Sequence, residues 1–167
     1  MRPQDIVILL KLVAAKDDYM QLAKLSHSLF ISLSEVSESL HRSQTANLLD
    51  YDKKKVMRQN LLEFLEHGVR YVFPQKPGSM VRGIPTAHSH PFMKENFNSE
   101  INYVWPDIKG DVIGLLIEPF YSKQVEAVKE DTGLYKLLAL VDVTRVGKVR
   151  EIKLAVSELK KIILRES

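Results

Sequence analysis

The chain has 167 residues, no cysteine, and a formal net charge of +3 from 24 Lys and Arg against 21 Asp and Glu. This length allows one domain or two small ones, and the lack of cysteine excludes disulfides, thiolate zinc sites and cysteine nucleophiles. The longest apolar runs, which start at Ile6 and Val112, are too short to span a membrane. With no targeting signal visible, we expect a cytoplasmic protein without membrane contact. Because the net charge is mild, any case for nucleic acid depends on where the charges lie.

Residues 3–15 predict an apolar helix. Pro3 suits the first helical position and Asp5 suits the first turn. Only Lys11 interrupts the apolar run that follows, so we expect this helix to be buried on most faces. One of those faces could meet a second subunit.

The serine-rich segment 32–45 predicts a second type of helix. A helix over 18–29, capped by Asp17 or Asp18, precedes it, and the short turn FIS separates the two. Ser32 stands three residues before Glu35, which is the S-x-x-E capping box. The expected inward stripe is Leu33, Val36 and Leu40. The serines therefore lie on a capped helix and not in a loop.

The segments up to residue 74 predict a hairpin, a helix and a strand. Leu48, Leu49, Tyr51, Val56 and Met57 flank a polar tip formed by Asp52, Lys53, Lys54 and Lys55. A helix over 59–67 is expected to stop at Gly68 as a left-handed C′ residue. Residues 69–73 then read as a short strand ended by Pro74.

The second half of the chain predicts a long connection and then helices. Residues 75–110 contain many prolines and little periodicity, which favours an extended connection. A buried strand is expected over 112–117, followed by helices over 122–131, 133–145 and 148–165. The last helix has an apolar stripe and, with the helix at 3–15, is the expected homodimer interface.

The predicted fold class is α+β, mainly α, in three regions. Residues 1–74 form a winged helix-turn-helix because two helices, a turn, a capped helix and a hairpin follow in that order. Residues 75–110 form the extended connection, and residues 111–167 form a C-terminal helical dimerisation region containing a short β pair. In such a fold the helix at about 32–45 enters the major groove and the hairpin tip at 52–58 reaches the backbone.

The candidate DNA-binding residues are the polar side chains expected on the outer side of that helix and at the tip. Short hydroxyls can approach a phosphate or base edge, and arginine and glutamine have the reach for guanine and adenine. The lysines and the arginine of the tip would neutralise phosphates. The set is Ser34, Ser37, His41, Arg42, Gln44, Lys53, Lys54, Lys55 and Arg58.

Two sets of residues resemble known families. Leu25, Leu29, Ser32, Ser34-Glu35-Val36-Ser37 and Leu40 are similar to the LAxxLxxSxSEVSxxLxxL pattern of bacterial winged-helix regulators of the MarR type. Phe30 replaces the usual left-handed glycine of that pattern, and Ser26 replaces a common alanine. The segments EFLEHGVRYVFP, VRGIPTAHS and LYKLLALVDVTRVGKVRE resemble a little-described group of bacterial winged-helix regulators. The resemblance implies a DNA-binding regulator, with a role beside a toxin-like partner as one option.

Other functions find less support in the residues. Glu38 would repel phosphates unless it accepts a hydrogen bond from a cytosine amine or pairs with Arg42. This leaves a protein-interaction module, antitoxin-like or adaptor, as the alternative. His67, His88 and His90 are favoured as ordinary loop histidines over a metal site. Asp142 is expected to pair with Arg145, and no constellation of residues predicts an enzyme or a cofactor. The expected partners are double-stranded DNA and a second copy of the chain, with a protein partner as the alternative.

Overall fold

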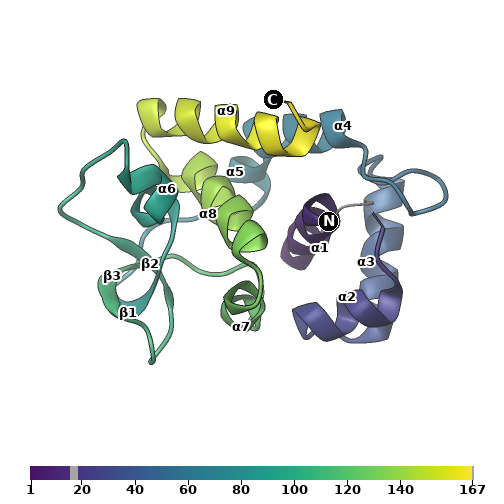
Figure 1. Ribbon diagram of the computed structural model, residues 1–167, viewed down its shortest axis with the longest axis horizontal. Helices are drawn as coiled ribbons and strands as arrows, with labels where there is room; N and C mark the ends of the chain where they lie inside the picture. Colours follow the sequence, from purple (N-terminus) through teal and green to yellow (C-terminus); the bar gives the residue numbers. More distant parts are fainter. Residues whose placement is uncertain (16–18, 167) are drawn as a thin grey trace.

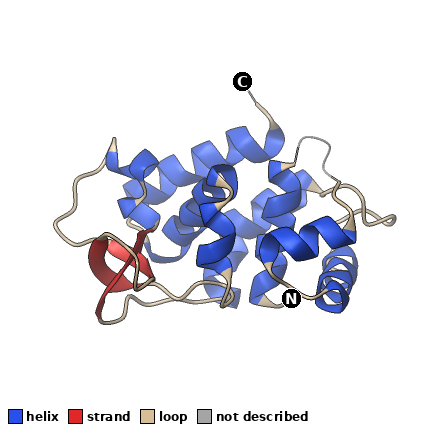
Figure 2. Cartoon of the chain, turned by 60° about the horizontal axis from the view of Figure 1, so that its bottom comes forward, coloured by secondary structure: helices blue, strands red, loops and turns tan. Residues whose placement is uncertain are grey.

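The computed structural model describes residues 1–15 and 19–166. The fold is α+β, with helices over most of the molecule and a small sheet at one end (Figures 1 and 2). In chain order the elements are α1 (Pro3–Ala14), α2 (Leu22–Leu29), α3 (Leu33–Thr45), α4 (Arg58–Glu63), the π-helix η1 (Phe64–Gly68), α5 (Val69–Val72), β1 (Met80–Pro85), the 3₁₀ turn η2 (Ala87–Ser89), α6 (Pro91–Lys94), β2 (Tyr103–Pro106), β3 (Val112–Leu116), α7 (Gln124–Lys129), α8 (Thr132–Val146) and α9 (Val149–Leu164). Within these residues no helix has both the length and the apolar character needed to cross a bilayer.

Helix α1 lies at the centre of the molecule. Its residues 6–10 are completely buried, and it packs against α2 and α3 on one side and α8 on the other (Figure 1). The apolar stripe of α9 packs on α8 and α4 of the same chain, with Leu159 and Ile163 buried. The chain itself therefore buries α1 and the middle of the α9 stripe, whereas Val149 at the start of α9 is 70% exposed, so that the predicted dimer interface is covered only in part and dimerisation stays a prediction.

The sheet has three strands, each paired with the other two. β1 is antiparallel to both β2 and β3, and β2 and β3 are parallel. Gly83 faces Pro106 on one side and Val112 on the other, and a Cβ at this position would come within 2.0 Å of the Trp105 carbonyl oxygen. Close strand approach of this kind requires glycine.

The sheet corrects two expectations. Residues 75–110 were expected to be an extended connection but contain β1, β2, η2 and α6, and the expected β pair is a three-stranded sheet. Glycine and proline inside these short strands hide the alternation on which a strand prediction depends. The strand expected over 112–117 and the three final helices are confirmed as β3, α7, α8 and α9.

The segment around Gly68 also differs from the prediction. Gly68 has φ −114° and ψ −36°, so it is not a left-handed stop, and the helix continues through η1 into α5 where a strand was expected. A Cβ on Gly68 would lie 2.8 Å from the ring of Phe64. This glycine therefore lets the Phe64 ring pack closely against the π-helical turn, and it does not end the helix.

Hydrogen bonds to a buried ion pair within α8 join this helix to the sheet. Asp142 pairs with Arg145 at 3.0 Å, as predicted, and its other carboxylate oxygen accepts hydrogen bonds from Thr86 Oγ1 and Trp105 Nε1, both at 2.8 Å. Burial raises the pKa of Asp142, while Arg145 and these two donors oppose that shift. Because the donors come from the ends of β1 and β2, this cluster fixes the sheet against α8.

Candidate nucleic-acid interface

The turn between α2 and α3 contains a bulky residue in the left-handed conformation. Phe30 takes the left-handed conformation, with φ 57° and ψ 39°, where the family pattern has glycine. Its ring is 54% exposed, and Ser26 Oγ donates to the Ile31 carbonyl at 2.5 Å across the turn. Helix α2 begins at Leu22, and the caps expected at Asp17 or Asp18 lie outside the described residues.

Helix α3 presents a polar outer face. Ser32 caps it by accepting from the Glu35 backbone N–H at 3.2 Å, which confirms the predicted helix start. Of the candidate residues on this helix, Ser34, Ser37 and His41 are exposed and Gln44 is half-buried. Val36 and Leu40 are buried as expected, whereas Leu33 is 54% exposed and does not belong to the inward stripe.

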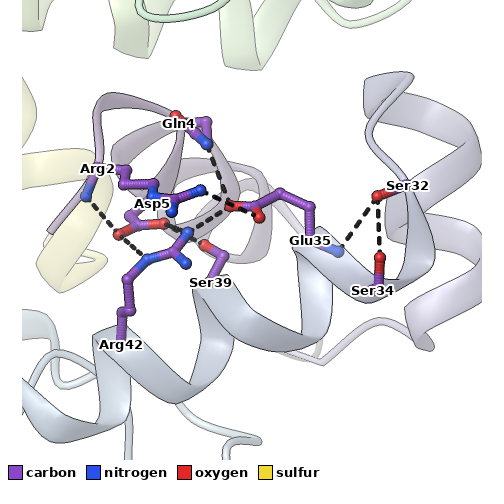
Figure 3. Close-up of polar contacts among 8 residues, drawn as sticks. All are labelled: Arg2, Gln4, Asp5, Ser32, Ser34, Glu35, Ser39 and Arg42. Carbon is purple, nitrogen blue, oxygen red and sulfur yellow. Dashed lines mark hydrogen bonds and ion pairs between the residues drawn. The ribbon is translucent and has the colours of Figure 1, made fainter.

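Arg42 does not lie on this outer face. Its Nε and Nη2 donate to the two carboxylate oxygens of the fully buried Asp5 at 3.0 and 2.8 Å, and Nη2 also contacts Glu35 at 2.5 Å (Figure 3). Arg42 was expected to reach DNA, but its guanidinium is instead bound to Asp5 and Glu35, and it forms no ion pair with Glu38 among the described residues. A completely buried carboxylate is costly unless a charged group pairs with it, whereas an arginine at the surface is solvated by water. The pairing with Asp5 therefore holds Arg42 against α1.

The remaining bonds of this cluster are local to α1 and α3. Asp5 also accepts from the Arg2 backbone N–H at 2.8 Å and from Ser39 Oγ at 2.6 Å, and Gln4 Nε2 donates to Glu35 at 3.1 Å (Figure 3). Burial tends to raise the pKa of Asp5, but the bonds from Arg42, Arg2 and Ser39 bring it below its usual value. The bond from Arg42 likewise lowers the pKa of Glu35. The cluster therefore remains ionised at neutral pH and locks α3 onto α1.

The segment after α3 forms a compact loop in place of a full hairpin. We call residues 49–56 the wing; a single bridge between Leu49 and Val56 closes it. The Asp50 carboxylate accepts the backbone N–H groups of Lys54 and Lys55 at 2.7 and 3.0 Å, and these bonds, led by the one from Lys55, lower the pKa of Asp50. Sequence reasoning missed Asp50, although an aspartate at the start of a turn is a typical signal for such bonds.

The side chains at the wing divide into two groups. Lys54 and Lys55 are exposed and Lys53 is half-buried, and none of the three forms an ion pair with another described residue. Tyr51, expected as a flanking strand residue, is 88% exposed in the wing. Arg58, also expected to bind DNA, lies on α4, and its Nη1 donates to the Ile163 carbonyl at the end of α9.

The outer face of α3 and the wing lie at the same edge of the molecule, opposite the sheet (Figures 1 and 2). Helix α3 packs on α1 and α2, so the second half of the chain leaves its outer face uncovered. Ser34, Ser37 and His41 belong to α3, and the three lysines belong to the wing. Glu38 and Asp52 are exposed there as well, so the positive charge of the edge is modest.

The three histidines considered for metal binding do not form a common site. His88 Nε2 is 2.7 Å from the Ile101 carbonyl oxygen, and His90 Nδ1 accepts the Phe92 backbone N–H at 3.1 Å. His67 lies on η1 and pairs with Glu66 at 3.6 Å. Over residues 1–15 and 19–166, no group of three or more His, Cys, Asp or Glu side chains is arranged to hold a metal ion.

Comparison with known proteins adds no family to this geometry. No protein-family model matches the chain, and neither the curated proteins nor the solved structures contain a significant match.

Proposed function

We propose that the chain is a sequence-specific DNA-binding transcriptional regulator that uses α3 in the major groove and the wing on the phosphate backbone. One observation carries the proposal: the polar outer face of α3 and the lysines of the wing lie together at an uncovered edge. Serine, histidine and glutamine side chains on a protruding helix suit contacts to base edges. The wing lysines, close to the end of that helix, suit phosphate contacts.

The set of contact residues is smaller than the sequence predicts. Arg42 is held by Asp5 and Glu35, and Arg58 is held by α9. The remaining direct contacts are Ser34, Ser37, His41 and Gln44 on α3 and Lys53, Lys54 and Lys55 in the wing, with Tyr51 added. A homodimer on a palindromic site stays part of the proposal, and its interface must lie outside α1 and the buried stripe of α9.

The test starts with selection of bound sequences from a random duplex pool at low salt. The affinity of the wild-type protein for the selected duplex is then compared with that of the variant Lys53→Ala/Lys54→Ala/Lys55→Ala. The control is Lys76→Ala/Lys94→Ala/Lys109→Ala, whose exposed lysines lie in the half of the chain that contains the sheet. Loss of three phosphate contacts should reduce the slope of log affinity against log salt by about 2.7. The control should behave as wild type. A pool without any bound duplex, or equal losses in both variants, would reject the proposal.

A protein-interaction module is the second candidate. It is favoured by the exposed apolar residues Phe30 and Leu33 and by the exposed Glu38, which forms no ion pair with another described residue. Glu38→Gln discriminates between the two functions. Near phosphates the carboxylate is repulsive by roughly 1 kcal/mol at 4 Å, so the substitution should raise duplex affinity up to about fivefold. At a surface that binds protein, duplex affinity should not change.

A further inference from the structure

Helix α9 has a strongly basic outer face. Arg150, Lys153, Lys160 and Lys161 are exposed, and at 3.6 residues per turn they fall within about 100° of the helix circumference. The buried residues of α9, which include Ala155, Leu159 and Ile163, lie on the opposite side. Only Ser157 and the half-buried Leu164 share the basic arc.

The acids of α9 do not neutralise this face. Glu151 is nearly buried and accepts the Lys148 backbone N–H at 2.8 Å. Glu158 pairs with Lys136 of α8 at 2.7 Å. Neither carboxylate lies within the basic arc, and no ion pair joins the four cations to any other described residue.

The basic face holds more than the whole net charge of the protein. Residues 148–165 contain six Lys or Arg and two Glu, which gives +4 against +3 for the complete chain, so the rest of the chain sums to −1. A polyanion approaching the molecule would meet its strongest attraction here.

The C-terminal end of helix α9 lies near the wing. Arg58, the first residue of α4, donates to the Ile163 carbonyl in the last turn of α9, and in Figure 1 this end of α9 lies over α4 on the side of the wing. Lys160 and Lys161 are therefore at the end of α9 nearer the wing. Arg150 is roughly 16 Å further along the helix axis, at 1.5 Å per residue.

We propose that the basic face of α9 binds the phosphate backbone of duplex DNA that flanks the segment contacted by α3 and the wing. This inference rests on the proposed function and supplies positive charge that the α3 edge lacks. Duplex is favoured over an acidic protein because stable protein interfaces are built around buried apolar anchors. On this arc the only apolar residue is the half-buried Leu164.

The test compares two duplexes centred on the same selected site. One has about 12 base pairs and covers the segment at α3 and the wing, and the other has about 30 and, at 3.4 Å per base pair, extends past it to reach α9. The variant is Arg150→Gln/Lys153→Gln/Lys160→Gln/Lys161→Gln. The matched control, with the same change in charge, is Lys76→Gln/Lys94→Gln/Lys109→Gln/Lys123→Gln, all exposed in the structure. Circular dichroism melting verifies that both proteins are folded.

Wild type and control should bind the long duplex at least tenfold more tightly than the short one, with a salt slope steeper by up to about 3.6. The α9 variant should lose this difference and bind the short duplex as wild type does. Equal binding of both duplexes by wild type, an unchanged length effect in the variant, or equal loss on both duplexes would overturn the inference. Loss of long-duplex binding only in the α9 variant, with the wing variant unaffected, would instead support α9 and reject the function proposed for α3 and the wing.

Discussion

The orientation of the Arg42 side chain is set by one buried carboxylate, that of Asp5. In the sequence Arg42 lies on the polar side of a helix and has the reach for guanine, but in the fold Asp5 is completely buried beside it. Sequence spacing places residues on a helix face but does not reveal a charged group on another helix 37 positions away. We therefore interpret Arg42 as the residue that orients α3, and Ser34, Ser37 and His41 as the residues that face solvent.

We expect Arg42→Ala to lower the free energy of unfolding by roughly 3 kcal/mol, because it leaves Asp5 buried without its charged partner. Urea unfolding measures this loss. Adding Asp5→Asn should restore part of it by removing the stranded charge, while the exposed Glu38→Gln should change stability by less than about 0.5 kcal/mol. A loss below about 1 kcal/mol in Arg42→Ala would contradict the structural role.

His90 predicts a pH dependence of stability. Burial, with a smaller contribution from Lys136, lowers the pKa of His90 from 6.5 to about 4. Between pH 4 and pH 6.5 the unfolded chain binds a proton at this histidine more readily than the folded chain does. The contribution of neutral His90 to the free energy of unfolding is therefore fully present above pH 6.5 and is lost as the pH falls towards 4. The loss is up to about 3 kcal/mol. Urea unfolding between pH 7 and pH 4 gives the slope of the free energy of unfolding against pH. This slope should be smaller in His90→Gln and unchanged in the control His27→Gln, which alters an exposed histidine. An unchanged slope in His90→Gln would refute the assignment.

At the scale of elements, the sequence predicts best where one local interaction sets the boundary. The Ser32 cap and the apolar spacing behind it define α3, and the apolar pattern defines α8 and α9. The prediction fails at Gly68, where the helix continues and the glycine lets the Phe64 ring lie close to the backbone. A glycine in the sequence does not by itself show whether its backbone conformation or its packing explains its presence.

Gly68→Ala tests the packing role of this glycine. The new Cβ would meet the Phe64 ring at 2.8 Å, so we expect a loss of about 1–2 kcal/mol from overpacking. In the control Gly133→Ala, the Cβ meets only Asp131 Oδ1 at 3.4 Å, and the better helix propensity of alanine should offset any cost. Thermal unfolding of both variants gives the comparison; equal melting temperatures would contradict the packing explanation.

The wing makes a prediction that separates shape from charge. Asp50→Ala removes the acceptor for the Lys54 and Lys55 backbone N–H groups, so duplex affinity should fall about five- to tenfold even though a negative charge is lost. Asp52→Ala makes the same charge change at an exposed position and should bind as wild type or slightly more tightly. Fluorescence anisotropy with the selected duplex measures both. If Asp50→Ala binds the duplex more tightly than wild type, the wing conformation held by Asp50 does not contribute to binding.

At the scale of the whole molecule, α1 and α8 join the two halves of the chain into one core. The buried apolar cluster includes residues from α1, α3, α8 and α9, and Lys11 of α1 pairs with Asp131, the cap of α8, at 2.6 Å. The sequence predicts the apolar faces of α1 and α9 but not which partner covers them, since an apolar face fits a second subunit as well as the same chain. The sheet was less predictable still, because its strands lie among glycines and prolines and pair over long distances.

The central claim is that the outer face of α3 and the wing together face the duplex. Backbone amide chemical-shift mapping by NMR during titration with the selected short duplex tests it most directly. We predict that the perturbed amides concentrate in 33–45 and 50–56, while β1, β2 and β3 at the opposite end stay unchanged. Perturbations confined to the sheet and α8, or no perturbation of α3 and the wing at saturating duplex, would contradict the account.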